Sequence, residues 1–203
     1  MESNGRRVRV LVTLGTDVHP FDRLVSWTER LIQEVPALDV TVQHGTTRSA
    51  AGADNVAMMD GGEFSEALAH SDLVISQGGP GGIFEARSAG RLPLVVPRRQ
   101  ELGEHVDNHQ VIFTSMLAEQ RIIRLAEGED DFLSQAVQMI ESGAAILPSR
   151  AQRTPDGVSA YLDILQRPAS PLPMRTRLRR AWSSLRPQAP NLEDGFSAGR
   201  APQ

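Results

Sequence analysis

Glycines gather in one short stretch of the chain, immediately after Gln77. Four of the next five residues are glycines: Gly78, Gly79, Gly81 and Gly82. Because glycine has no Cβ, backbone N–H groups there can approach a ligand closely, and the start of the helix expected at Gly82–Ala89 adds about half a positive charge. Such a loop binds phosphate or diphosphate without a lysine. The alternative interpretation is a tight turn that binds nothing.

Glu85 lies in the first turn of that expected helix. Its carboxylate could complement the positive end of the helix, which contributes ~0.3–1 kcal/mol, or accept hydrogen bonds from the vicinal hydroxyls of a ribose. Both interpretations are open from the spacing alone. A nicotinamide dinucleotide fits poorly, because Phe84 stands where the third glycine of its fingerprint belongs. The second expected strand also runs into Gln43-His44-Gly45, without the acidic residue that such cofactors need.

A second polar segment runs from Arg98 to Gln110, directly after an apolar run. The four-residue spacing of His105 and His109 could present two imidazoles to one metal ion, but no third ligand is evident. We therefore expect no metal there. We interpret the segment as a hydrogen-bonding rim around a polar ligand.

Short apolar runs alternate with helical patterns through the N-terminal part of the chain. Strands are expected at Val8–Leu14, Asp39–Gln43, Asn55–Met59, Asp72–Ser76, Pro93–Pro97 and Ile122–Leu125, and helices at Pro20–Glu34, Glu63–His70, Gly82–Ala89, His105–Glu119 and Asp130–Ser142. This alternation predicts an α/β fold with a doubly wound parallel sheet, covered on both faces. In the usual strand order 3-2-1-4-5-6 the first and fourth strands are neighbours, so the loop at Gly15 and Thr16 and the glycine loop face one crevice.

Composition excludes several classes of protein. The chain has 203 residues and a mass of 22.1 kDa, enough for one domain with an extension. It has no cysteine, which excludes disulfides and thiolate catalysis, and no lysine, which excludes a Walker-type phosphate loop and Schiff-base chemistry. No apolar run is long enough to span a membrane and no secretory signal precedes the first strand, so we expect a cytoplasmic location.

Charge divides the chain into an acidic body and a basic tail. The residues up to Leu147 carry a balance of −9 and the rest a balance of +5, within a net charge of -4. We expect a domain at 1–150, a helix at 151–167 that packs on the body or on a partner, and a Pro/Arg-rich tail at 168–203. An amphipathic helix at 174–186 could lie on an anionic membrane surface, or the tail could simply be solvated. The acidic body argues against nucleic acid as a partner.

Several groups of residues together resemble one known family. They are Val12–Thr16 with Pro20–Leu24, then Ser71–Ala86, then Arg91–Arg98 with Leu102–Gln110. In this order they resemble the C-terminal domain of glycosyltransferase family 28. That family includes the C-terminal half of MurG, the catalytic subunit of the split dolichol-pathway N-acetylglucosaminyltransferase and bacterial exopolysaccharide glycosyltransferase subunits. The resemblance covers roughly residues 8–147 and is specific, because several ordered motifs agree.

The resemblance implies a single Rossmann-like half of a GT-B glycosyltransferase, which takes a UDP-sugar as its donor substrate and needs no cofactor. Gly15 and Thr16 would then line the donor diphosphate together with the glycine loop. Glu85 would hold the ribose. His109 and Gln110 would contact the donor, as part of the polar rim.

The implied reaction inverts the anomeric carbon, because an acceptor hydroxyl attacks the face opposite the departing nucleotide diphosphate. The helix N-terminus and Arg98 or Arg99 would stabilise the leaving charge without a divalent metal. His19, in the loop after the first strand, is the candidate general base. The chain departs from its relatives at Gln77, where His or Arg is common, and at Pro80, where a small residue such as alanine is usual.

A complete transferase of this type has two Rossmann-like halves, and 203 residues hold only one. We therefore expect a membrane-associated partner subunit that binds the acceptor, a hydroxyl of a lipid-linked molecule or a polysaccharide. The sequence thus predicts the donor-binding catalytic subunit of an inverting, UDP-sugar-dependent hexosyltransferase, peripheral at the cytoplasmic membrane face. The alternative is a non-catalytic nucleotide-sugar-binding or regulatory subunit. A hydrolysing UDP-sugar epimerase is disfavoured, because such enzymes also need two domains.

Overall fold

Six parallel strands form the centre of the computed structural model, which describes residues 6–143, 145 and 146. The strands are β1 (Val8–Thr13), β2 (Leu38–Gln43), β3 (Asp54–Val56), β4 (Leu73–Gln77), β5 (Leu94–Val96) and β6 (Arg124–Leu125). Their order is β3-β2-β1-β4-β5-β6, so the predicted fold class and strand order are confirmed. Every pairing is parallel, which places the carboxyl ends of β1 and β4 side by side at one edge of the sheet.

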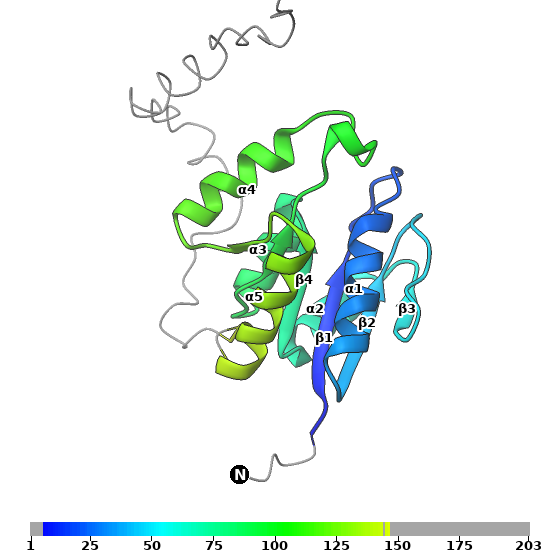
Figure 1. The fold of residues 1–203 in the computed structure, drawn as a ribbon, viewed down its shortest axis with the longest axis vertical. Helices are drawn as coiled ribbons and strands as arrows, with labels where there is room; N and C mark the ends of the chain where they lie inside the picture. Colours follow the sequence, from blue (N-terminus) through cyan, green and yellow to red (C-terminus); the bar gives the residue numbers. More distant parts are fainter. Residues whose placement is uncertain (1–5, 144, 147–203) are drawn as a thin grey trace, which may run out of the picture. The chain divides into compact units, whose positions relative to one another are not determined.

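Helices cover both faces of this sheet (Figure 1). They are α1 (Asp22–Glu34), α2 (Gly61–His70), α3 (Pro80–Ser88), α4 (His109–Glu119) and α5 (Glu129–Ser142). On one face α1 and α5 pack together, where the rings of Trp27 and Phe132 lie 5.6 Å apart between centroids. On the other face α2 and α3 pack against the sheet, and α4 packs beside α3 through Phe84 and Phe113.

Alternation along β1 explains why its sequence is almost continuously apolar. Val10 and Val12 belong to the core cluster shared with α1 and α5, whereas Leu11 between them packs with Leu68 of α2 and Ala86 of α3. All of these side chains are buried. Where a strand is covered on both faces, side chains on both faces are buried, so successive residues such as Val10, Leu11 and Val12 are all apolar.

Among the element boundaries that differ from the sequence-based expectation, two bear on the site. Helix α3 begins at Pro80 and not at Gly82, because the fixed φ of proline suits the first position of a helix. Glu85 is consequently the sixth helical residue, so its predicted place in the first turn is wrong. Helix α4 begins at His109 and not at His105. The residues before it include a short 3-10 helix, η1 (Gln100–Leu102).

The predicted helix at 151–167, the tail at 168–203 and the amphipathic helix at 174–186 lie outside the described residues, so they stay predictions. Within the described part of the chain, none of the helices combines the length and the apolar character that crossing a bilayer requires.

Candidate functional site

A cavity of about 390 Å³ opens at the carboxyl ends of the strands. Its wall is contributed by the end of β1 and the loop that follows, the end of β2, the segment between β3 and α2, and the junction of β4 with α3. The lining residues are Thr13, Gly15, Thr16, Gln43, Met58, Met59, Asp60, Gly61, Phe64, Ser76, Gln77, Gly79, Pro80, Gly81, Gly82 and Glu85. The crevice expected between the first and fourth strands therefore exists.

The N-terminus of α3 is open toward this cavity. No side chain caps it, and Pro80 at the first helical position has no N–H to offer. The N–H of Ile83 already bonds to the carbonyl of Gly79 at 3.4 Å. Within the described residues, the N–H groups of Gly81 and Gly82 have no partner, and both residues line the cavity. Unpartnered N–H groups at the positive end of a helix form an anion site.

The loop glycines serve two different purposes. A Cβ on Gly79 would lie 2.3 Å from Nε2 of Gln77, and one on Gly78 would lie 2.9 Å from Oε1 and 3.0 Å from Cβ of Gln110, so a larger residue at either position would displace these glutamine side chains. A Cβ on Gly81 would meet nothing within 4 Å. Gly81 therefore leaves open space in the cavity beside its free N–H group.

Glu85 stands in the cavity wall one helical turn beyond Gly81, and its carboxylate has no hydrogen-bond partner among the described residues. Residues four apart lie on the same side of a helix, so this carboxylate and the N–H groups of the first turn face the same space. Gly15 and Thr16 also line the cavity, on the loop after β1. Gly15 has a φ of +76°, which favours glycine at that position.

Arg98 does not line the cavity but holds the loop after β1 in place. Its side chain is buried, and its guanidinium donates to the carbonyl oxygens of Leu14 at 2.8 Å, His19 at 2.6 Å and Glu104 at 3.1 Å. Burial lowers the pKa of Arg98, an effect that the charges of Asp17 and Glu104 oppose. The structure thus gives Arg98 a scaffolding position, away from any leaving group in the cavity.

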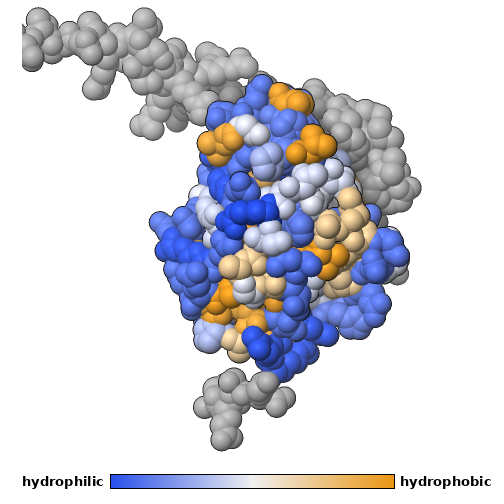
Figure 2. All heavy atoms as spheres, turned by 90° about the vertical axis from the view of Figure 1, so that its right-hand side faces the viewer, coloured by the Kyte–Doolittle hydropathy of each residue, from blue (hydrophilic) through white to orange (hydrophobic). Residues whose placement is uncertain are grey.

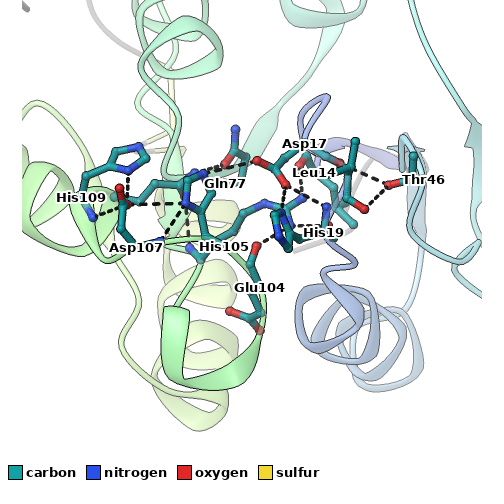
Figure 3. Close-up of polar contacts among 12 residues, drawn as sticks. Leu14, Asp17, His19, Thr46, Gln77, Glu104, His105, Asp107 and His109 are labelled. Carbon is teal, nitrogen blue, oxygen red and sulfur yellow. Dashed lines mark hydrogen bonds and ion pairs between the residues drawn. The ribbon is translucent and has the colours of Figure 1, made fainter.

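Three histidines and two aspartates alternate above the sheet edge, from the loop after β1 to the start of α4 (Figure 3). Asp17 bonds through Oδ1 to Nδ1 of His19 at 2.6 Å and through Oδ2 to Nε2 of His105 at 3.3 Å. Asp107 in turn lies against Nδ1 of both His105 and His109. None of the five lines the cavity.

The two carboxylates of this row are held ionised. Burial raises the pKa of Asp17, but hydrogen bonds from the backbone and ring of His19, with the charges of Arg98 and His105, outweigh burial and lower it. Hydrogen bonds from the backbone and ring of His109 lower the pKa of Asp107.

His105, Asp107 and His109 are also the group in the described residues whose ligand atoms lie close enough for one metal ion, within 4.8 Å of one another. Asp107 already has a structural task there, since it accepts the backbone N–H of His109 at 3.0 Å where α4 begins. This local turn, in which a side chain bonds to the backbone two residues on, gives the carboxylate of Asp107 a role that needs no ion. The expectation of no metal stays a prediction.

Gln110, expected to contact a ligand, is almost completely buried behind the cavity. It joins the backbone N–H of Arg98 to the side chain of Gln77, and Gln77 is the residue that reaches the cavity. Asp60, at the start of α2, is a lining residue that sequence reasoning missed. Its signal was the pattern of an aspartate three residues before Glu63, which is typical of a helix start.

The family model for the glycosyltransferase family 28 C-terminal domain matches residues 9–170. The chain belongs to this family. The predicted resemblance is thereby confirmed, and the match extends beyond the residues on which it was recognised. No curated protein sequence matches this family 28 chain at a significant level.

Solved structures share the fold of the family 28 chain. The glycotransferase of kitacinnamycin aligns with a TM-score of 0.54 and 16% identity, over 81% of this chain and 44% of that one. MurG of Acinetobacter baumannii gives 0.53 and 16%, over 81% and 51%. ALG13 gives 0.50 and 18%, over 77% and 94%. The chain thus spans about half the length of the first two proteins, and identities this low establish the fold alone.

Proposed function

We propose that this family 28 chain is the donor-binding catalytic subunit of an inverting glycosyltransferase that transfers a sugar from a UDP-sugar to an acceptor hydroxyl. The observation that carries the proposal is the open N-terminus of α3, with Gly81 and Gly82 on the cavity and the free carboxylate of Glu85 one turn further. Oriented N–H groups bind a diphosphate, and a carboxylate accepts from two ribose hydroxyls. The phosphates would lie on α3 and the ribose at Glu85.

In the proposed reaction an acceptor oxygen forms a bond to the anomeric carbon while the bond from that carbon to the UDP oxygen breaks, and the configuration inverts. The described lining contains no arginine or histidine, and its charged members are Asp60 and Glu85. Neutral N–H groups of the first turn of α3 are therefore the donors proposed to stabilise the charge on UDP.

His19 is the proposed general base for the acceptor proton. Its Nδ1 is paired with Asp17 at 2.6 Å, which favours the tautomer that carries hydrogen on Nδ1 and leaves Nε2 able to accept a proton. The ring is partly exposed, on the loop that also carries Thr16. Because His19 stands outside the cavity lining, it would meet an acceptor that arrives from the open side.

An acceptor-binding partner is proposed to dock on this edge. Three exposed apolar side chains lie in the loops around the row of histidines: Val18, Leu102 and Val106, with exposed fractions of 75%, 54% and 64%. Figure 2 shows apolar side chains gathered at the end of the body that Figure 1 places uppermost. Exposed apolar patches mark interaction sites.

Calorimetric titration with UDP, UDP-sugars, ADP and NAD tests the donor site. We expect uridine diphosphates to bind and Glu85→Ala to weaken UDP by about tenfold to a hundredfold, the scale for losing hydrogen bonds to a charged group. Glu119→Ala removes another exposed helical glutamate, at the end of α4, and is the matched control.

Failure of every uridine nucleotide to bind, or equal affinity for ADP and NAD, would contradict the donor assignment. Transfer is then measured with the acceptor-binding partner present. Tight UDP binding without sugar transfer in that assay would favour the non-catalytic alternative.

A further inference from the structure

The side-chain amide of Gln110 has only one possible orientation. The backbone N–H of Arg98 points at its Oε1 at 3.1 Å. A backbone N–H can only donate, so the atom that faces it must be the oxygen. The other amide atom of Gln110 is therefore a nitrogen, with hydrogens to donate.

That nitrogen determines the orientation of the next amide. Nε2 of Gln110 lies 2.7 Å from the side chain of Gln77, and because it can only donate, Gln77 must turn its Oε1 toward it. Nε2 of Gln77 then points away from Gln110, to the space between Gly15 and Gly79. Atoms built as Cβ on these two glycines would come within 2.6 and 2.3 Å of it.

The two hydrogen bonds, from Arg98 to Gln110 and from Gln110 to Gln77, form a relay. This relay ends in a hydrogen-bond donor at the cavity. Gln77, Gly15 and Gly79 all line the cavity, and Nε2 of Gln77 has no hydrogen-bond partner among the described residues. Gln110 does not line the cavity and is buried. Gln110, which does not line the cavity, thus determines that Gln77 presents a donor and not an acceptor to it.

We propose that Gln110 is a positioning residue that holds Gln77 with its Nε2 hydrogens toward the diphosphate of the donor. The proposal rests on the proposed function. It assigns Gln110 an indirect task in place of donor contact. Gln77 then supplies a neutral donor beside the N–H groups of α3, in a cavity whose described lining has no cationic side chain.

Gln110→Glu is the sharpest test, because it reverses the direction of the hydrogen bond to Gln77 with a side chain of the same length, although it also adds a negative charge at a buried position. A carboxylate still accepts the N–H of Arg98 but cannot donate to Gln77, so the Gln77 amide turns over and presents Oε1 to the ligand. We expect UDP to bind roughly tenfold to a hundredfold more weakly, with the protein still folded. Gln120→Glu adds the same charge to an exposed residue at the other end of α4, about 15 Å away, and is the control.

Gln77→Glu is the second variant, and it keeps the bond from Gln110 intact. Its second carboxylate oxygen faces the cavity, so UDP binding should fall by roughly a hundredfold or more through like-charge repulsion. A spectroscopic reading accompanies the wild type and Gln110→Glu. On addition of UDP to the wild type, the side-chain NH₂ signals of Gln77 should shift in NMR spectra while those of Gln110 barely move, and Gln110→Glu should abolish the Gln77 shift.

These outcomes separate the two proposals. Wild-type protein that does not bind UDP overturns the proposed function. If the wild type binds UDP, then Gln110→Glu with an affinity within twofold of the Gln120→Glu control, or a Gln77 NH₂ signal that ignores UDP, overturns the positioning role alone. Should Gln110→Glu fail to fold, Gln77→Glu and the wild-type NMR titration decide the question.

Discussion

Two helices, α2 and α3, begin at the same cavity, and their N-termini are built in opposite ways. At α2 the carboxylate of Asp60 accepts the N–H groups of Gly62 at 2.8 Å and Glu63 at 2.9 Å, and the carboxylate of Glu63 accepts the N–H of Asp60 at 2.9 Å. At α3 no side chain caps the helix. The same unsatisfied backbone groups are closed internally in one helix and left for a ligand in the other.

The difference teaches where an anion can bind in this cavity. Both Asp60 and Gly81 line it, but Asp60 brings a negative charge to the wall whereas Gly81 brings an open space and an N–H group. Under the proposed function, the carboxylate of Asp60 would repel the diphosphate from the start of α2, and the open N-terminus of α3 would attract it. The cap of α2 would then orient the donor in addition to stabilising the helix.

A carboxylate introduced at the start of α3 should abolish the difference between the two helix N-termini. Of the changes considered, it should have the largest effect on UDP affinity. In Gly81→Asp the new side chain enters open space, so the fold is retained and the helix start gains ~0.3–1 kcal/mol. UDP affinity should fall by more than about a hundredfold, because a like charge occupies the anion site. Gly81→Asn fills the same space without charge, and calorimetry of the pair isolates the charge. Equal UDP affinities for the two variants would contradict the anion site.

Removing the cap of α2 should have a smaller effect, on the stability of the fold and not on UDP affinity. Asp60→Ala leaves the N–H groups of Gly62 and Glu63 without their acceptor, which lowers the free energy of unfolding by roughly 1 kcal/mol. UDP affinity should not fall, since a carboxylate has left the cavity. Asp60→Asn retains a capping oxygen and should lose less stability in urea unfolding. Weaker UDP binding by Asp60→Ala would show that α2 takes part in the anion site.

The smallest expected effect is on the free energy of unfolding, and it concerns Asp17 in the loop after β1. Because the pKa of Asp17 is lowered in the folded protein, its charged form contributes stability at every pH above the unfolded value of about 3.9. That contribution is lost as the pH falls through the folded pKa. Asp17→Asn should therefore be less stable than the wild type at pH 7, by less than about 1 kcal/mol. Unfolding curves should converge below about pH 4; a difference independent of pH would contradict the pairing.

Most of the fold could be predicted because it depends on repeating physical constraints. Strand segments buried on both faces are mostly apolar, as residues 10–12 of β1 and residues 73–75 of β4 are, and α1 shows its buried stripe at helical spacing. Boundaries were harder where proline and local caps decide them. Pro80 moved the start of α3 by two residues, and Asp107 together with Gly103, at a φ of +70°, delays α4 until His109.

Residues of the candidate site could be predicted where their backbone groups line the cavity. They could not be predicted where the packing of the side chain against distant segments decides its position. The glycine loop and Glu85 followed from spacing and from the family, and Gly79, Gly81, Gly82 and Glu85 line the cavity, whereas Gly78 packs against Gln110. Arg98 and Gln110 look like ligand-binding residues in the sequence, because a polar side chain after a strand is read as facing a ligand. Their burial depends on contacts with distant segments, the carbonyl of Leu14 for one and the side chain of Gln77 for the other.

The hydrogen bonds of Arg98 also determine when the loop after β1 becomes ordered. Its guanidinium ties carbonyl oxygens from separate segments together, at Leu14, His19 and Glu104, so the loop that carries Gly15 and Thr16 is held before any donor arrives. Immobilising a backbone residue costs about 1–2 kcal/mol of entropy, and here that cost falls on folding and not on binding. The loop after β1 is thus preorganised before any ligand binds in the cavity.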